Sequence, residues 1–74
     1  MTITVKLFAS FRTGRFEIET GDYPAGTTVA DVADRLNLPQ SELGIMMVNN
    51  RHVKLERPLA DGDTLALFPL LGGG

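Results

Sequence analysis

Apolar and polar residues alternate along two short runs near the start of the chain, over residues 2–8 and 15–20. A period of two places every second side chain on the same face, which is typical of a β-strand with one buried side. Residues 9–14 lie between the two runs and have the composition of a turn, with Gly14 able to adopt a positive φ. The pattern therefore predicts an antiparallel hairpin of two strands.

The period of the apolar positions then changes to that of an α-helix. Four apolar residues have the i, i+3, i+4 and i+7 spacing of one helical face: Val29, Val32, Ala33 and Leu36. Thr28 is suited to cap the first turn of this helix, and Pro39 disfavours helical backbone at the residue before it. We therefore place a helix over residues 29–37.

Three more strands are expected after the helix, over residues 45–48, 51–54 and 64–68. Asn49 and Asn50 tolerate left-handed backbone, which predicts a tight turn between the first two of these strands. The element order β-β-α-β-β-β favours an α+β fold in which one helix packs across one face of a sheet. The apolar side chains expected to face the helix are Ile3, Val5, Leu7, Phe16, Ile18, Val29, Val32, Leu36, Leu65 and Leu67, with some of residues 45–48.

Length and composition limit what such a domain can do. The chain has 74 residues and a net charge of −2, so it lacks the basic surface that nucleic acid or an anionic membrane attracts. It has no cysteine and one histidine, so we expect no metal site and no bound cofactor. No run approaches the roughly 20 apolar residues of a transmembrane helix, and the first residues do not resemble a signal peptide, so we expect a cytoplasmic protein. A domain this small favours a carrier, adaptor or binding module over an enzyme.

The last three residues are all glycine: Gly72, Gly73 and Gly74. Ordering consecutive glycines is entropically unfavourable, so a glycine run is useful where a chain must be flexible and free of side chains. A segment without side chains can enter a narrow channel, and its only functional group is the α-carboxylate of Gly74. A frayed terminus explains the composition equally well. We expect a folded domain over residues 1–69 and a flexible tail over residues 70–74.

A partner-docking surface is expected at the base of this tail. The alternation that buries Leu67 turns Phe68 outward. An exposed apolar patch at this position is typical of a docking surface. The residues assigned to it are Phe68, Pro69, Leu70, Leu71 and Met47. Two alternatives remain open, because Phe68 could instead cover a sheet edge and both Met46 and Met47 could be buried.

The chain ends in Leu-Phe-Pro-Leu-Leu-Gly-Gly-Gly at residues 67–74. Four further motifs precede this ending: Val-Lys-Leu-Phe-Ala at residues 5–9, the helix start at residues 26–32, Val-Asn-Asn-Arg at residues 48–51 and Leu-Ala-Asp-Gly-Asp at residues 59–63. In this order, the motifs resemble those of the MoaD/ThiS family of ubiquitin-like sulfur carriers. The resemblance implies the β-grasp fold, in which a mixed sheet of about five strands has its first and last strands parallel at the centre.

The resemblance also implies a mechanism. A ubiquitin-activating-enzyme-like adenylyltransferase would use ATP to adenylate the carboxylate of Gly74, and sulfur from a persulfide donor would convert it to a thiocarboxylate. A synthase subunit would then receive the sulfur. Gly73 and Gly74 match the diglycine of the family, and Gly72 is an extra glycine that some members have.

The resemblance leaves several functions open. The Leu-Phe-Pro segment favours the small subunit of a molybdopterin synthase, whereas the glycines and the length suit a ThiS-like carrier for the thiazole of thiamine equally well. Outside sulfur transfer, the chain could be a protein modifier that forms isopeptide bonds through Gly74. It could also be a non-covalent β-grasp binding module whose tail has no role.

Overall fold

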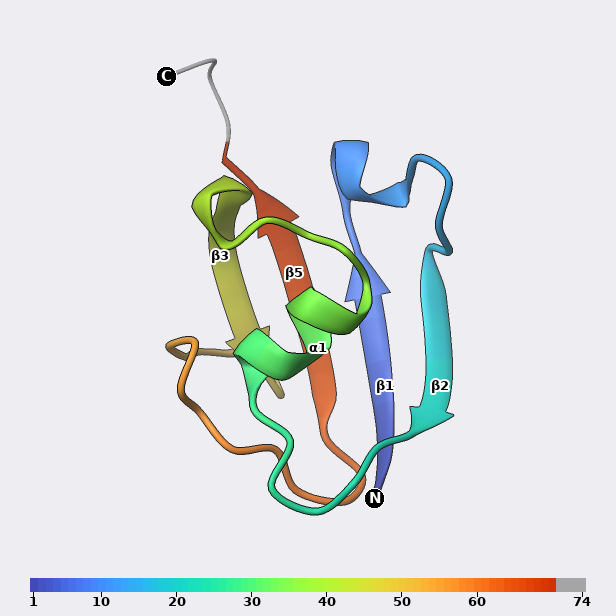
Figure 1. Ribbon diagram of the computed structural model, residues 1–74, viewed down its shortest axis with the longest axis vertical. Coiled ribbons are helices and arrows are strands. Elements are labelled where there is room, and N and C mark those ends of the chain that lie inside the picture. Colours follow the sequence, from blue (N-terminus) through green and yellow to red (C-terminus); the bar gives the residue numbers. More distant parts are fainter. Residues whose placement is uncertain (71–74) are drawn as a thin grey trace.

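The computed structural model describes residues 1–70, and Figure 1 shows its helix α1 lying across one face of a sheet. The sheet has five strands in the order β2-β1-β5-β3-β4. The elements are β1 (Thr2–Leu7), η1 (Ala9–Arg12), β2 (Ile18–Asp22), α1 (Val29–Arg35), η2 (Gln40–Glu42), β3 (Leu43–Val48), β4 (Arg51–His52) and β5 (Thr64–Pro69). Strands β1 and β5 are parallel at the centre, and the other neighbouring pairs are antiparallel. This is the mixed sheet with one helix that the sequence and the family resemblance predicted.

The helix begins and ends at residues with defined capping roles. Thr28 accepts a hydrogen bond from the backbone N–H of Asp31, and the Asp31 carboxylate accepts one from the N–H of Thr28, which together form a capping box. The helix ends two residues before the predicted boundary, because Asn37 adopts a left-handed conformation with a φ of 59°. The N–H of Leu38 then donates to the carbonyl of Ala33 at 2.9 Å, which completes a Schellman motif.

The core lies between α1 and the sheet. Its buried apolar residues are Ile3, Val5, Leu7, Phe11, Tyr23, Val29, Val32, Ala33, Leu38, Val48, Leu59, Leu65 and Leu67. The sequence predicted the members that lie on strands and on the helix, except Ala33, which it placed on the apolar face of the helix without including it in the core. It missed Phe11, Tyr23, Leu38 and Leu59, because these residues lie outside the regular strands and α1 and therefore follow no period.

The prediction that Ile18 faces the core is wrong. Its side chain is 57% exposed. The predicted strand over residues 15–20 is in fact β2, Ile18–Asp22, and a bend at Glu17 separates its first residue from Phe16. Phe16 packs against the core, whereas Ile18 pairs with the exposed Lys6 on the opposite face of the sheet.

The turn predicted between the two later strands is confirmed. Asn49 and Asn50 have φ values of 51° and 68° and connect β3 to β4. Strand β4 has only two residues, so the predicted strand over residues 51–54 is shorter than expected. Within residues 1–70 there is no helix with the length and hydrophobicity needed to cross a lipid bilayer.

Candidate functional site: the outward face and the base of the tail

The last strand, β5, lies in the middle of the sheet and leads directly to the predicted tail. Leu65, Leu67 and Pro69 are buried, and the residues between them are half-buried. Strand β5 ends near the top of the molecule in Figure 1, and beyond it the chain reaches Leu70, whose side chain is 63% exposed. The predicted site residues Leu71, Gly72, Gly73 and Gly74 lie outside the described residues.

Phe68 points away from the core, on the face of the sheet that α1 does not cover. Its ring stacks on that of Phe8, with 4.1 Å between the ring centroids and 9° between the ring planes. Both residues are therefore half-buried rather than fully exposed. The stack forms because β1 and β5 run parallel and bring Phe8, the residue after β1, beside the end of β5.

The antiparallel pairing of β3 with β5 adds two apolar side chains to this face. Ile45 pairs with Phe68 and is 38% exposed. Met47 pairs with Ala66 and is half-buried on the same face, whereas Met46 packs against the core. Met47 is therefore the methionine that faces outward, as the sequence predicted.

We define the outward patch as the apolar side chains gathered on this face: Phe8, Ile18, Ile45, Met47 and Phe68. Sequence reasoning assigned Phe68 and Met47 to a docking surface but missed the other three. Pro69 was assigned to the same surface, yet its ring is buried on the helix side of β5 and takes no part in the outward patch. The alternation in β1 could have identified Phe8, because it places residue 8 on the same outward face as Lys6.

A polar group borders the outward patch on its β2 side. The guanidinium of Arg12 lies 5.4 Å from the centre of the Phe8 ring, and its Nε donates to the carbonyl of Leu7 at 2.8 Å. Arg12 also forms an ion pair with Glu17 at 3.5 Å. A hollow of about 280 Å³ opens between these side chains, lined by Lys6, Phe8, Arg12, Glu17 and Ile18. The patch thus combines an apolar surface with a small charged recess.

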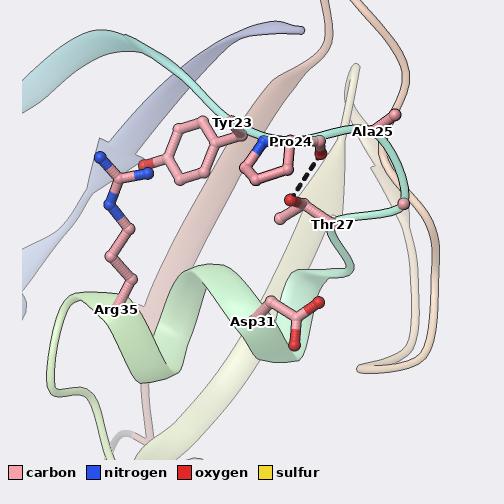
Figure 2. Close-up of a pocket in the computed structure, with 7 residues that line it drawn as sticks. Tyr23, Pro24, Ala25, Thr27, Asp31 and Arg35 are labelled. Carbon is pink, nitrogen blue, oxygen red and sulfur yellow. Dashed lines mark hydrogen bonds between the residues drawn. The ribbon is translucent and has the colours of Figure 1, made fainter.

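A second, wider hollow of about 440 Å³ lies beside the β2–α1 loop, and Figure 2 shows the side chains around it. The guanidinium of Arg35 lies 4.4 Å from the centre of the Tyr23 ring and donates to the carbonyl of Asp22 at 3.2 Å. Thr27 donates to the carbonyl of Pro24 at 2.7 Å. These polar groups hold the loop against the helix. The β2–α1 loop lies at the end of the sheet opposite to the C-terminal end of β5 (Figure 1).

The acidic side chain of Asp63, just before β5, is used within the fold. Asp63 is buried, and its carboxylate accepts hydrogen bonds from the side-chain amide of Asn49 at 3.0 Å and from the N–H of Ala60 at 2.8 Å. Across residues 1–70 no three His, Asp or Glu side chains are grouped so that they could hold a metal ion.

The chain matches a family model and several solved structures. The model described as the ThiS family matches residues 5–74. SAMP1 from Haloferax volcanii is 28% identical, with a TM-score of 0.76 and 100% of both chains covered; another structure from that organism is named small archaeal modifier protein 1. A putative molybdopterin converting factor, subunit 1, from Pyrococcus furiosus is 28% identical, with a TM-score of 0.75 and 96% of this chain and 99% of that chain covered.

A more distant likeness is to a chain in the complex of subunits 1 and 2 of the molybdopterin-converting factor from Helicobacter pylori. It is 20% identical, with a TM-score of 0.67 and 100% of both chains covered, and it shows the shared fold alone. Comparison with curated protein sequences gives no match. Together these likenesses show that the chain has the predicted ubiquitin-like β-grasp fold.

Proposed function

The chain belongs to the ThiS family, and on that premise we propose that it is a sulfur carrier, which other enzymes modify and which is not itself an enzyme. The observation that carries this proposal is that the family match continues to residue 74 and therefore includes the terminal glycines. The tail follows the central strand β5, and the outward patch lies beside its base. An enzyme that binds the outward patch would thus hold the start of the tail close to its own active site.

The chemistry requires only one group from this chain, the carboxylate of Gly74. A carboxylate oxygen attacks the α-phosphorus of ATP and pyrophosphate leaves, which gives an acyl-adenylate on the activating enzyme. The terminal sulfur of a persulfide then attacks the acyl carbon and AMP leaves. Cleavage of the resulting sulfur–sulfur bond by a thiol releases the thiocarboxylate and a disulfide. No cofactor bound by this chain takes part, because ATP is bound by the activating enzyme.

The outward patch is the surface that we expect the activating enzyme and the synthase subunit to contact. Ile18 and Ile45 are exposed there although they are large and apolar, and such side chains gain free energy when a partner covers them. The neighbour from Helicobacter pylori was solved as a complex of two subunits, which supports a synthase subunit as one partner. We expect this transfer to occur in the cytoplasm.

Among sulfur pathways, we favour the small subunit of a molybdopterin synthase. The Leu-Phe-Pro segment at residues 67–69 and the likeness to the putative molybdopterin converting factor subunit of Pyrococcus furiosus support this choice. The ThiS family match supports a carrier for the thiazole of thiamine as the alternative. Complementation of strains that lack either carrier would separate the two pathways.

A second function is favoured by one specific comparison. The relative from Haloferax volcanii is named as a modifier protein, so a chain with the same fold and a terminal glycine could form isopeptide bonds through Gly74. The adenylate is common to both routes, and the routes differ in the nucleophile that displaces AMP. Conjugates of higher mass that disappear when Gly74 is deleted would support the modifier.

Reconstitution tests the sulfur-carrier proposal. The full chain is incubated with its activating enzyme, ATP and a persulfide donor, and the C-terminal peptide is analysed by mass spectrometry. We expect the wild-type chain to acquire a thiocarboxylate and a variant without Gly73 and Gly74 to acquire none. Full activity of that truncated variant in its pathway would contradict the proposal and favour the non-covalent binding module.

A further inference from the structure

A β-bulge lies in β3 beside the last residues of β5. Leu43 pairs with Pro69 and Ile45 pairs with Phe68, so two steps along β3 correspond to one step along β5. Gly44 is the extra residue between these two pairs. A bulge bends its own strand and increases the local twist of the pair, and the chain paired with it here is the base of the tail, Pro69 and Leu70.

The backbone of Pro69 and Leu70, which we call the tail base, occupies the space in which a side chain at residue 44 would lie. A Cβ at Gly44 would lie 2.7 Å from the carbonyl oxygen of Pro69, 2.9 Å from its carbonyl carbon and 3.0 Å from the Cα of Leu70. These atoms belong to the backbone, so no rotation of a flexible side chain could relieve the contact. Any residue other than glycine therefore requires a backbone shift, either at Pro69 and Leu70 or at residue 44 itself.

One hydrogen bond holds the tail base in this position. The N–H of Leu70 donates to the carbonyl of Glu42 at 2.9 Å, which extends the β3–β5 pairing one residue beyond β5. Pro69 has no N–H to donate. The close approach at Gly44 and the hydrogen bond of Leu70 therefore both restrain the backbone of Pro69 and Leu70.

From these contacts we infer that Gly44 is a positioning residue that sets the direction in which the tail leaves the sheet and enters the activating enzyme. This inference rests on the proposed function. Four residues follow Leu70, and they span at most about 14 Å when fully extended. Because the reacting carboxylate lies at their far end, a displacement at Leu70 changes where that carboxylate arrives.

The test compares Gly44→Ala with Gly21→Ala in the full chain. Gly21 also lies in a strand, but a Cβ there would meet only the Tyr23 ring at 3.9 Å, an ordinary contact. Gly21→Ala therefore controls for the substitution itself. Both proteins are assayed with the activating enzyme by ATP–pyrophosphate exchange, which gives the kcat of adenylation and the KM for the carrier chain. Amide hydrogen exchange of each protein is measured without the enzyme.

We expect Gly44→Ala to lower kcat by about 10- to 100-fold, as a small misplacement of a reacting group does. The KM should stay close to that of Gly21→Ala, because the outward patch is retained. Amide exchange should become faster at Leu70 while Leu65 and Leu67 keep their protection. A general loss of stability would instead speed exchange along the whole of β5.

Two results would overturn the inference: an unchanged kcat, whether or not KM rises, or faster amide exchange throughout β5. If Gly44→Ala does not fold, Leu70→Pro removes the N–H that donates to Glu42 without adding a Cβ at residue 44, and the same fall in kcat is expected. An unchanged kcat for Leu70→Pro would also overturn the inference. If neither the wild-type chain nor Gly21→Ala supports ATP–pyrophosphate exchange, the proposed function itself is contradicted.

Discussion

Both faces of the sheet carry large apolar side chains, but within residues 1–70 a helix covers only one of them. On the helix side, Leu65 and Leu67 are completely buried. On the opposite side, Ile18 is 57% exposed and Ile45 is 38% exposed. Each Å² of apolar surface removed from water contributes about 25 cal/mol. The helix-side residues therefore stabilise the fold, whereas the outward residues keep much of this free energy available for association.

Strand β5 brings the two roles together in consecutive residues. Leu67 packs in the core, Phe68 joins the outward patch, and Pro69 is buried again. A strand of this kind couples the tail to both the rigid core and the surface that a partner would cover. Substitutions on the two faces should therefore separate folding from docking.

The largest effect is expected from Leu67→Ala. Truncation of a fully buried leucine leaves a cavity and should lower the free energy of unfolding by about 2–5 kcal/mol. Ile18→Ala, on the outward face, should lower it by less than about 0.5 kcal/mol. Urea denaturation of both variants measures the difference, and equal losses would contradict the contrast between the two faces.

Phe68→Ala should have its main effect on docking. The loss of a central aromatic residue of an interface weakens binding by about 2 kcal/mol, or roughly 30-fold in Kd, and the lost stack on Phe8 should lower stability by only about 1 kcal/mol. Titration calorimetry with the activating enzyme measures the Kd. Thr64→Ala is the control, because Thr64 lies on the same strand and face but at the end away from the tail. Equal Kd values for the two variants would refute the docking role.

Thr28→Ala should have the smallest effect and should act on the helix side alone. It removes the side chain that accepts a hydrogen bond from the N–H of Asp31 at 3.2 Å. Loss of such a cap lowers the free energy of unfolding by about 1 kcal/mol. The Kd for the activating enzyme should not change, and a weaker Kd would place part of the interface on the helix.

Regular periodicity made the helix side of the fold predictable. Alternation on the strands and the 3.6-residue period of α1 identified the buried faces, because burial follows those periods directly. The turn at Asn49 and Asn50 was also predictable, since few residues tolerate two successive positive φ values. Phe11 could not be predicted in the same way, because a 3₁₀ turn, rather than a strand, carries it into the core.

The outward face was only partly predictable, because its composition depends on pairing between distant strands. Phe68 and Met47 followed from alternation within their own strands. Phe8 joins the patch through the parallel pairing of β1 with β5, and Ile45 joins it after the bulge at Gly44. No local pattern in the sequence encodes either register. The assignment of Ile18 failed for a related reason, since the bend at Glu17 ended the alternation that the prediction assumed.

The most direct test of the central claim is the intact mass of the protein purified from its native cells under conditions that protect thiols. If the chain is a sulfur carrier, a fraction of the molecules should show the mass increase of one oxygen replaced by sulfur, and fragmentation should place this change at Gly74. An unmodified carboxylate on every molecule, both in this sample and after incubation with ATP, the activating enzyme and the sulfur donor, would contradict the account.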